Sequence, residues 1–353
     1  MLYPLKFNPV FKDYIWGGRN LQKLGKILPE GIVAESWEIS CHPDGISTVA
    51  NGEYKDLPLP ELIKKSGRQL IGSALPDSDL EKFPLLVKLI DANDKLSVQV
   101  HPEDQYAAVN ENGELGKNEM WYIISAKPGA KLVYDIAPGI TRSSFAKAVR
   151  ENKIESCLKY IEVFPGDFLN IPAGLVHAIG EGIVLAEIQQ NSNTTYRVYD
   201  YNRTDKSGNK RPLHIGKALD VIAFGNAGRK EKYKGLSIKI AENCYKTYKI
   251  ANKYFCVELY SINGTVEENA DGSRFCLYVF IEGEGTIEYH GGAEHVNQGQ
   301  SVLIPAFMGS YHICGNLKAL KSYVPDLDKN VLEPLENAGY SKEDIFKNVS
   351  GLE

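Results

Sequence analysis

A histidine followed directly by proline, in the stretch "LSVQVHPED" (96–104), is the first candidate for chemistry in this 353-residue sequence. Side chains alternate in an extended segment, so Ser97, Gln99 and His101 share one face while two valines occupy the other. The proline ends the run because it cannot donate to a sheet ladder. Such a strand end is either a core edge with satisfied polar groups or half of a metal site.

Two further residues could complete a metal site, Glu119 in "GKNEMWYI" and His177 in "IPAGLVHAI". With Gln99 and His101 they offer two imidazoles, a carboxylate and an amide oxygen. This set suits one divalent ion per chain, most simply Zn²⁺, with a position left open. Taken singly, each histidine is more often a hydrogen-bonded structural residue, and the carboxylate a solvated one. The combination favours the metal, because a jelly-roll barrel gathers such strands around one cavity.

The elements that would hold these residues are mainly strands. Short apolar runs rich in Val, Ile, Tyr and Thr recur between Gly, Pro, Asn and Asp, which predicts an all-β core. Residues 165–179 and 297–313 share a frame of a glycine, a β run, Ile-Pro-Ala and a histidine, which predicts two related barrels. The second barrel is expected to bind no metal, because no equivalent pair precedes His312. Residues 278–292 predict a hairpin with Gly285 near its turn.

Helical segments are fewer. Residues 59–72 carry apolar residues at near-helical spacing, and residues 141–160 predict one or two helices with Thr141 or Ser143 as the N-cap. The tail, 330–349, is also predicted to be helical.

The length of the chain predicts two domains. The basic, polar stretch 224–237 is typical of an exposed linker, so we place the boundary there. Residues 1–230 are expected to form the metal-binding domain, with helical insertions. Residues 231–353 are expected to form a second, metal-free domain with a helical C-terminal tail.

Composition limits the partners. The chain is 43% hydrophobic and 24% charged, with a net charge of −5 and dispersed Lys and Arg residues. This argues against nucleic acid or an anionic membrane as partner but permits a small phosphorylated ligand. We expect a cytoplasmic monomer or homodimer, since the sequence shows neither a signal-peptide pattern nor an apolar run of membrane-spanning length. The six scattered cysteines, without a CxxC pair, are typical of reduced thiols.

Four stretches, in this order and spacing, resemble the type I mannose-6-phosphate isomerases of the cupin superfamily, most closely the short bacterial form: "LSVQVHPED", "GKNEMWYI", "IPAGLVHAI" and "LAEIQQNSNTTYRVYD". The resemblance implies a mainly β fold of two cupin-type jelly-roll β-barrels with a few helical segments. It implies a metal-dependent aldose–ketose isomerase that interconverts mannose 6-phosphate and fructose 6-phosphate by proton transfer between C1 and C2. The family's zinc ligands fall on Gln99, His101, Glu119 and His177.

The resemblance also assigns residues to the substrate. Its phosphate- and substrate-binding basic positions fall on Lys88 and Lys117, its strand-end serine on Ser97 and its active-site arginine on Arg197. Arg197 has an alternative interpretation as half of a surface or interdomain salt bridge.

A carboxylate that faces the same cavity in the family falls on Glu187. We predict Glu187 as the general base, with Lys117 or a metal-bound water as alternatives. An equally weighted interpretation makes Glu187 a carboxylate that orients His101 or His177.

Two departures from longer relatives bear on these assignments. Ile179 stands where they have a tyrosine, and "YDYNR" replaces their Thr-Pro-Lys element. Arg203 is our candidate for the substrate-binding cation lost there. Two other classes of protein remain open, a metal-dependent cupin oxygenase and a non-catalytic sugar-phosphate-binding cupin. A glutamine ligand beside Lys and Arg suits a charged sugar phosphate better than dioxygen chemistry.

Overall fold

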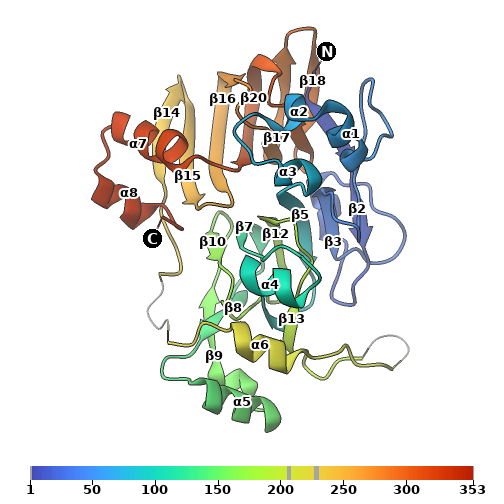
Figure 1. Ribbon diagram of the computed structural model, residues 1–353, viewed down its shortest axis with the longest axis vertical. Coiled ribbons are helices and arrows are strands. Elements are labelled where there is room, and N and C mark those ends of the chain that lie inside the picture. The colour runs from blue at the N-terminus through green and yellow to red at the C-terminus, as the bar shows by residue number, and fades with distance from the viewer. Residues whose placement is uncertain (1, 205–207, 226–229, 353) are drawn as a thin grey trace.

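Three β-sheets organise the computed structural model, which describes residues 2–204, 208–225 and 230–352 (Figure 1). Two of them face each other in the N-terminal half. The six-stranded sheet has the order β10-β7-β12-β5-β3-β2, and the five-stranded sheet has the order β13-β6-β11-β8-β9. The strands are β2 (Val10–Lys12), β3 (Glu35–Ile39), β5 (Leu85–Ala92), β6 (Val98–Val100), β7 (Glu119–Ala126), β8 (Lys131–Ile136), β9 (Leu158–Glu162), β10 (Phe168–Ile171), β11 (His177–Ala178), β12 (Ile183–Gln190) and β13 (Tyr196–Tyr199).

Apolar side chains of both sheets fill the space between them. Trp121, Ile123 and Leu185 from the six-stranded sheet pack with Leu132 and Tyr134 from the five-stranded one. The central strands β5 and β12 are buried along their whole length, because a second core covers their other face. This explains why their sequences are near-continuous apolar runs rather than alternating ones.

The third sheet has nine strands in the order β14-β15-β16-β20-β17-β19-β1-β4, with β18 beside β17. The N-terminal strand β1 pairs with β19, so the start of the chain joins a sheet built mostly from the C-terminal third. The strands are β1 (Leu5–Asn8), β4 (Thr48–Val49), β14 (Leu236–Ala241), β15 (Cys244–Ala251), β16 (Cys256–Ala270), β17 (Cys276–Tyr289), β18 (Gly292–Asn297), β19 (Ser301–Ile304) and β20 (Gly309–Tyr323).

The mainly β architecture is confirmed, although no sheet closes into a hydrogen-bonded barrel within the described residues. One core cluster joins Val87 and Leu89 of β5 to Leu277 and Leu303 of the nine-stranded sheet, so the two halves share packing. The boundary at residues 230/231 stays a prediction. Residues 226–229 of the predicted linker lie outside the described residues.

The repeated frame of the sequence gives the same local structure twice. Gly166 and Gly299 both have positive φ, of 91° and 82°, as a tight turn requires. A four-residue strand follows each glycine, β10 in the first copy and β19 in the second, and each strand ends at a proline.

The hairpin turn predicted near Gly285 is wrong. Strand β17 runs through Gly285 without interruption, and the turn to β18 lies at His290–Gly291. A Cβ atom at Gly285 would lie 2.3 Å from the carbonyl oxygen of Cys314. The glycine therefore permits the close approach of β20 rather than a turn.

Helices form where the sequence predicts them. Thr141 caps α5, since its hydroxyl accepts a hydrogen bond from Ser144 N at 3.2 Å. The tail helices pack on β14, β15 and β16 (Figure 1). The helices are η1 (Asn20–Leu24), α1 (Leu59–Ser66), α2 (Arg68–Ile71), α3 (Ser78–Glu81), α4 (Asp104–Asn110), α5 (Arg142–Arg150), η2 (Ile154–Cys157), α6 (Ile215–Val221), η3 (Asp328–Leu332), α7 (Glu333–Asn337) and α8 (Lys342–Asn348). Within the described residues, none of them combines the length and apolar character needed to cross a bilayer.

Candidate active site

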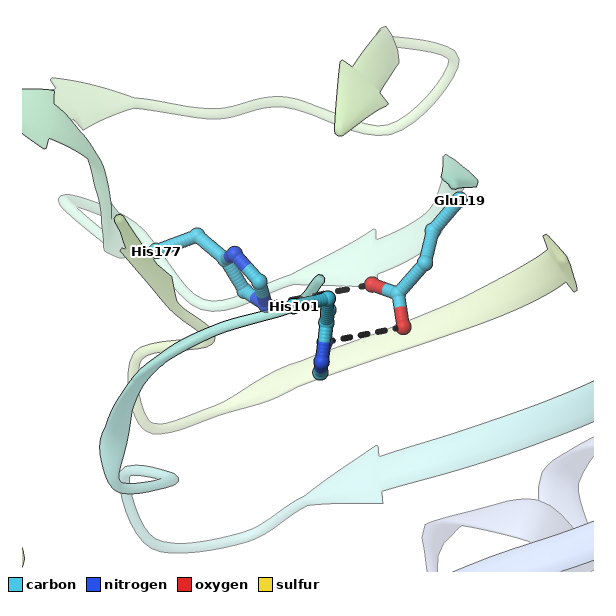
Figure 2. A group of neighbouring side chains, drawn as sticks. All are labelled: His101, Glu119 and His177. Carbon is cyan, nitrogen blue, oxygen red and sulfur yellow. Dashed lines mark ion pairs between the residues drawn. The ribbon is translucent and has the colours of Figure 1, made fainter. Parts of the chain in front are cut away.

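His101, Glu119 and His177 meet in the N-terminal half, although they lie on three separate segments (Figure 2). His101 follows β6, Glu119 begins β7 and His177 begins β11. Nε2 of His101 lies 3.2 Å from one Glu119 carboxylate oxygen, and Nε2 of His177 lies 3.9 Å from the other. One donor atom from each residue falls within 4.8 Å of the other two, and all three residues are buried.

The hydrogen bonds of the two imidazoles engage Nδ1 and leave Nε2 of each ring available to bind a metal. Nδ1 of His101 lies 2.8 Å from the carbonyl oxygen of Thr194, and Nδ1 of His177 lies 2.9 Å from that of Leu175. Because a carbonyl oxygen can only accept, each Nδ1 carries the ring hydrogen and donates a hydrogen bond. Each Nε2 is therefore unprotonated and directs its lone pair toward Glu119. Neither Glu119 oxygen accepts a hydrogen bond of good geometry from a described residue. Two Nε2 lone pairs and a carboxylate are a set of electron-pair donors that fits a divalent cation.

Gln99 stands beside this cluster because of the strand register. It pairs with His177 of β11 on one side and with Arg197 of β13 on the other, so the three side chains share one row. The amide nitrogen of Gln99 lies 3.3 Å from Nε2 of His177. Half a turn of the amide would put its oxygen there instead, and an amide oxygen is a group able to bind a cation.

Burial and charge set the protonation states that such a cation requires. Burial and the Lys117 ammonium lower the pKa of His101 to about 3, and burial lowers the pKa of His177 as well. Burial alone would raise the pKa of Glu119, but Lys117 at 2.8 Å and the two imidazoles hold it well below its usual range. Neutral imidazoles and an ionised carboxylate are the forms that bind metals.

Lys88 and Glu187 form a second buried group nearby. They are cross-strand partners on β5 and β12, with Nζ of Lys88 3.1 Å from the Glu187 carboxylate and 3.7 Å from that of Glu35. Trp121 Nε1 donates a hydrogen bond of 2.8 Å to the other Glu187 oxygen. Burial and Glu119 raise the pKa of Glu187, and Lys88 offsets them only in part. Burial would lower the pKa of Lys88, but the surrounding carboxylates outweigh it and raise that pKa.

A cavity of about 300 Å³ opens beside both groups. The fully buried His101, Glu119 and His177 do not line it, but Gln99 and Lys117, which contact them, do. The cavity brings together most of the residues singled out in the sequence: Lys88, Ser97, Gln99, Lys117, Glu187 and Arg197.

Glu187 does not orient either histidine, because both Nδ1 atoms bond to backbone carbonyls. Arg197 donates to Ser97 Oγ at 3.2 Å and to Pro212 O at 3.0 Å, and forms no ion pair with a described carboxylate. The structure therefore gives no support to the salt-bridge interpretation of Arg197.

Arg203 lies outside the cavity lining. Its guanidinium binds Asp200 at 2.6 Å and Asp94 at 3.1 Å. Sequence reasoning missed Arg211, Tyr14 and Glu35, which do line the cavity. Only the basic character of "NKRP" (209–212) pointed to Arg211, and its distance from the metal-ligand motifs gave no reason to place it there.

The mainly β fold and the buried His-His-Glu cluster beside a cavity are the features of a cupin with a candidate metal site. A solved structure of mannose 6-phosphate isomerase from Bacillus subtilis aligns with a TM-score of 0.84 at 36% identity, covering 90% of this chain and 99% of that one. A phosphomannose isomerase variant from Salmonella typhimurium aligns with a TM-score of 0.71 at 15% identity, which supports the fold alone.

The sequence comparisons then give the family. Residues 4–123 match the family described as "Phosphomannose isomerase type I, catalytic domain", and residues 245–324 match "Mannose-6-phosphate isomerase, cupin domain". The chain is 37% identical to the mannose-6-phosphate isomerase ManA of Bacillus subtilis, over 91% of this chain and 99% of that protein. It is 37% identical to the mannose-6-phosphate isomerase of Streptococcus mutans, over 92% and 99%. This chain belongs to the type I phosphomannose isomerase family, and the resemblance seen in the sequence is confirmed.

Proposed function

We propose that this chain interconverts mannose 6-phosphate and fructose 6-phosphate, with one Zn²⁺ held by Gln99, His101, Glu119 and His177. The observation that carries the proposal is the convergence of two Nε2 lone pairs and a carboxylate beside a cavity lined by a base and by cations. If held by these residues, zinc would supply Lewis-acid polarisation of a sugar oxygen and stabilise negative charge on it. Family membership favours the isomerase over a cupin oxygenase or a non-catalytic binding protein.

Glu187 is the proposed general base. Its carboxylate lines the cavity, is held by Trp121 and Lys88, and has a raised pKa, all of which suit a group that accepts and returns a proton. It takes the proton from C2 of the aldose and returns it to C1, while the hydroxyl proton of O2 is lost and O1 gains one. The atoms balance, because the two sugars are isomers.

The cations of the cavity are assigned to the substrate. Lys117 lies beside Glu119 and can hydrogen-bond an oxygen at the reacting carbons, while Arg197 and Ser97 are joined to each other and face the same space. We also propose that the protein is cytoplasmic, because six free cysteines suit a reducing compartment. For its oligomeric state we propose a monomer or homodimer.

The test is conversion of mannose 6-phosphate to fructose 6-phosphate by the purified protein. It is run as prepared, after removal of metal with a chelator, and after addition of Zn²⁺. Loss of activity followed by its restoration is expected, and the metal content of the same samples is measured in parallel. Absence of turnover in protein that carries one equivalent of zinc would refute the isomerase and leave the oxygenase and binding protein.

A further inference from the structure

An excess of positive charge lies on the side of the cavity formed by β13 and the segment after it. Arg211 donates two hydrogen bonds to the Asp200 carboxylate, at 2.8 and 2.6 Å, and Arg203 binds the same carboxylate at 2.6 Å. Asp94, the other carboxylate in contact, is half-exposed and pairs only with Arg203 among the described residues. Arg197 has no carboxylate partner there, so one buried anion faces three guanidinium groups.

The two arginines that line the cavity each keep one nitrogen unused. Arg197 donates through Nε and Nη1, to Ser97 and Pro212, and Arg211 donates through Nε and Nη2, both to Asp200. Nη2 of Arg197 and Nη1 of Arg211 therefore have no hydrogen-bond partner among the described residues. Burial and then the nearness of Arg211 lower the pKa of Arg197, and the Asp200 carboxylate offsets this repulsion only in part.

The metal side of the cavity has the opposite balance. Three carboxylates, those of Glu35, Glu119 and Glu187, accompany two ammonium groups, those of Lys88 and Lys117. A divalent cation bound among these residues would offset their excess negative charge. The excess positive charge of the arginines would then still lack a counter-charge. The cavity is therefore built for a ligand whose negative charge lies away from the metal.

The position of Arg211 is fixed by the chain on both sides of it. Thr204 and Lys210 form an antiparallel bridge just before it. After it, the backbone of His214 donates to Arg197 O at 2.8 Å, and Arg197 N donates to Nδ1 of His214 at 3.1 Å. The segment that carries Arg211 is thus hydrogen-bonded onto β13, one strand away from Gln99.

We infer that Arg197 and Arg211 together bind the phosphate group of the substrate, and that Asp200 holds Arg211 in place for this contact. The inference rests on the proposed function and adds its phosphate site. Planar guanidinium groups match the oxygen geometry of a phosphate and remain charged when buried. In this assignment Arg211, and not Arg203, supplies the cation that longer relatives take from their Thr-Pro-Lys element.

The experiment compares Arg211→Gln with Arg203→Gln in the zinc-loaded full-length protein. Both changes remove a partner of Asp200, but only Arg211 lines the cavity. For Arg211→Gln we expect the KM for mannose 6-phosphate and the inhibition constant of inorganic phosphate to rise about 10- to 100-fold, as for a lost hydrogen bond to a charged group. The kcat should change much less. Arg203→Gln should change both constants less than about threefold, and the exposed Arg142→Gln is the surface control.

Two results would overturn the inference. One is a folded Arg211→Gln protein with both constants within twofold of the parent, and the other is an Arg203→Gln protein that reproduces the full effect. If Arg211→Gln does not fold, Arg211→Lys keeps the charge but loses the planar fork, and a clear rise in both constants is still expected. Phosphate binding is also measured by calorimetry without turnover. A protein that binds phosphate through Arg211 but shows no isomerase activity would refute the proposed function alone.

Discussion

Lys88 and Glu187 face each other directly across β5 and β12, and their buried side chains form an ion pair of 3.1 Å at the edge of the cavity. The register of two central strands therefore decides the environment of the proposed base. Lys88 also contacts Glu35, so a single ammonium group compensates two carboxylates. The chemistry of Glu187 depends on this arrangement as much as on the residue itself.

Replacing the proposed base should slow turnover strongly without disturbing metal binding. For Glu187→Gln we expect kcat to fall about 10²- to 10⁴-fold, the contribution typical of a general base, because the amide cannot accept the C2 proton. Zinc content should stay at the parent value. The matched control is Glu267→Gln, which changes an exposed carboxylate of the nine-stranded sheet. A Glu187→Gln enzyme with near-parent kcat would assign the base to Lys117 or to a metal-bound water.

The pH profile should report the Lys88–Glu187 pair. Because the pKa of Glu187 is raised, its proton-accepting form is lost as the pH falls through a value above that of an ordinary glutamate, and kcat/KM should fall with it. Lys88→Met removes the cation that favours the carboxylate, so the acidic limb should move to higher pH. The change also leaves buried charge unpaired and should cost about 3–5 kcal/mol of stability. An unshifted acidic limb in this variant would show that a group other than Glu187 produces that limb.

Metal binding should stabilise the fold as well as support catalysis. If zinc binds only the folded state, zinc at a thousand times its dissociation constant raises the free energy of unfolding by about 4 kcal/mol. Chelation should therefore lower the Tm, and added Zn²⁺ should restore it. His101→Ala removes one of the buried Nε2 atoms of the candidate metal site and should make the Tm insensitive to both treatments. This readout does not depend on turnover.

A carboxylate of the nine-stranded sheet should make stability depend on pH. Burial raises the pKa of Glu268, but the Lys321 ammonium at 2.7 Å and the Tyr260 hydroxyl at 2.6 Å outweigh it and lower that pKa. A lowered folded-state pKa gives stability that is present above the unfolded pKa and is lost as the pH falls through the folded one. Thermal denaturation should therefore show Glu268→Gln to be less stable than the parent at pH 7. The difference should shrink near pH 3, and a difference independent of pH would contradict the role of this ion pair.

Two glycines should respond oppositely to alanine. A Cβ atom at Gly180 would lie 1.8 Å from the carbonyl oxygen of Lys131, so Gly180→Ala must displace β8 and should cost about 1–3 kcal/mol or more. Gly216 lies in α6 with no heavy atom within 4 Å of its added Cβ. Gly216→Ala should leave the Tm unchanged or raise it, because alanine favours helix by up to about 1 kcal/mol. Thermal denaturation of the two variants makes the comparison.

The sequence was informative at several positions where a local rule applied, although the turn predicted near Gly285 was wrong. Alternation placed Ser97 and Gln99 on one face, and both line the cavity. The cap of α5 at Thr141 and the strands that end in Ile-Pro-Ala followed from residue preferences alone. These features depend on the backbone geometry of a few neighbouring residues, which their side chains control.

Partnerships between distant segments were decided only by the tertiary structure. The pairing of β1 with β19, the close approach that requires Gly285, the exclusion of Arg203 from the cavity and the inclusion of Arg211 have no local signal. By itself the sequence determined the family, the mainly β character and three residues, His101, Glu119 and His177, that meet as a candidate metal site. Which charges face each other across the cavity depended on strand register and on the return of residues 210–214 to β13. Register and chain return minimise the free energy of the whole packed molecule, so no short stretch of sequence specifies them.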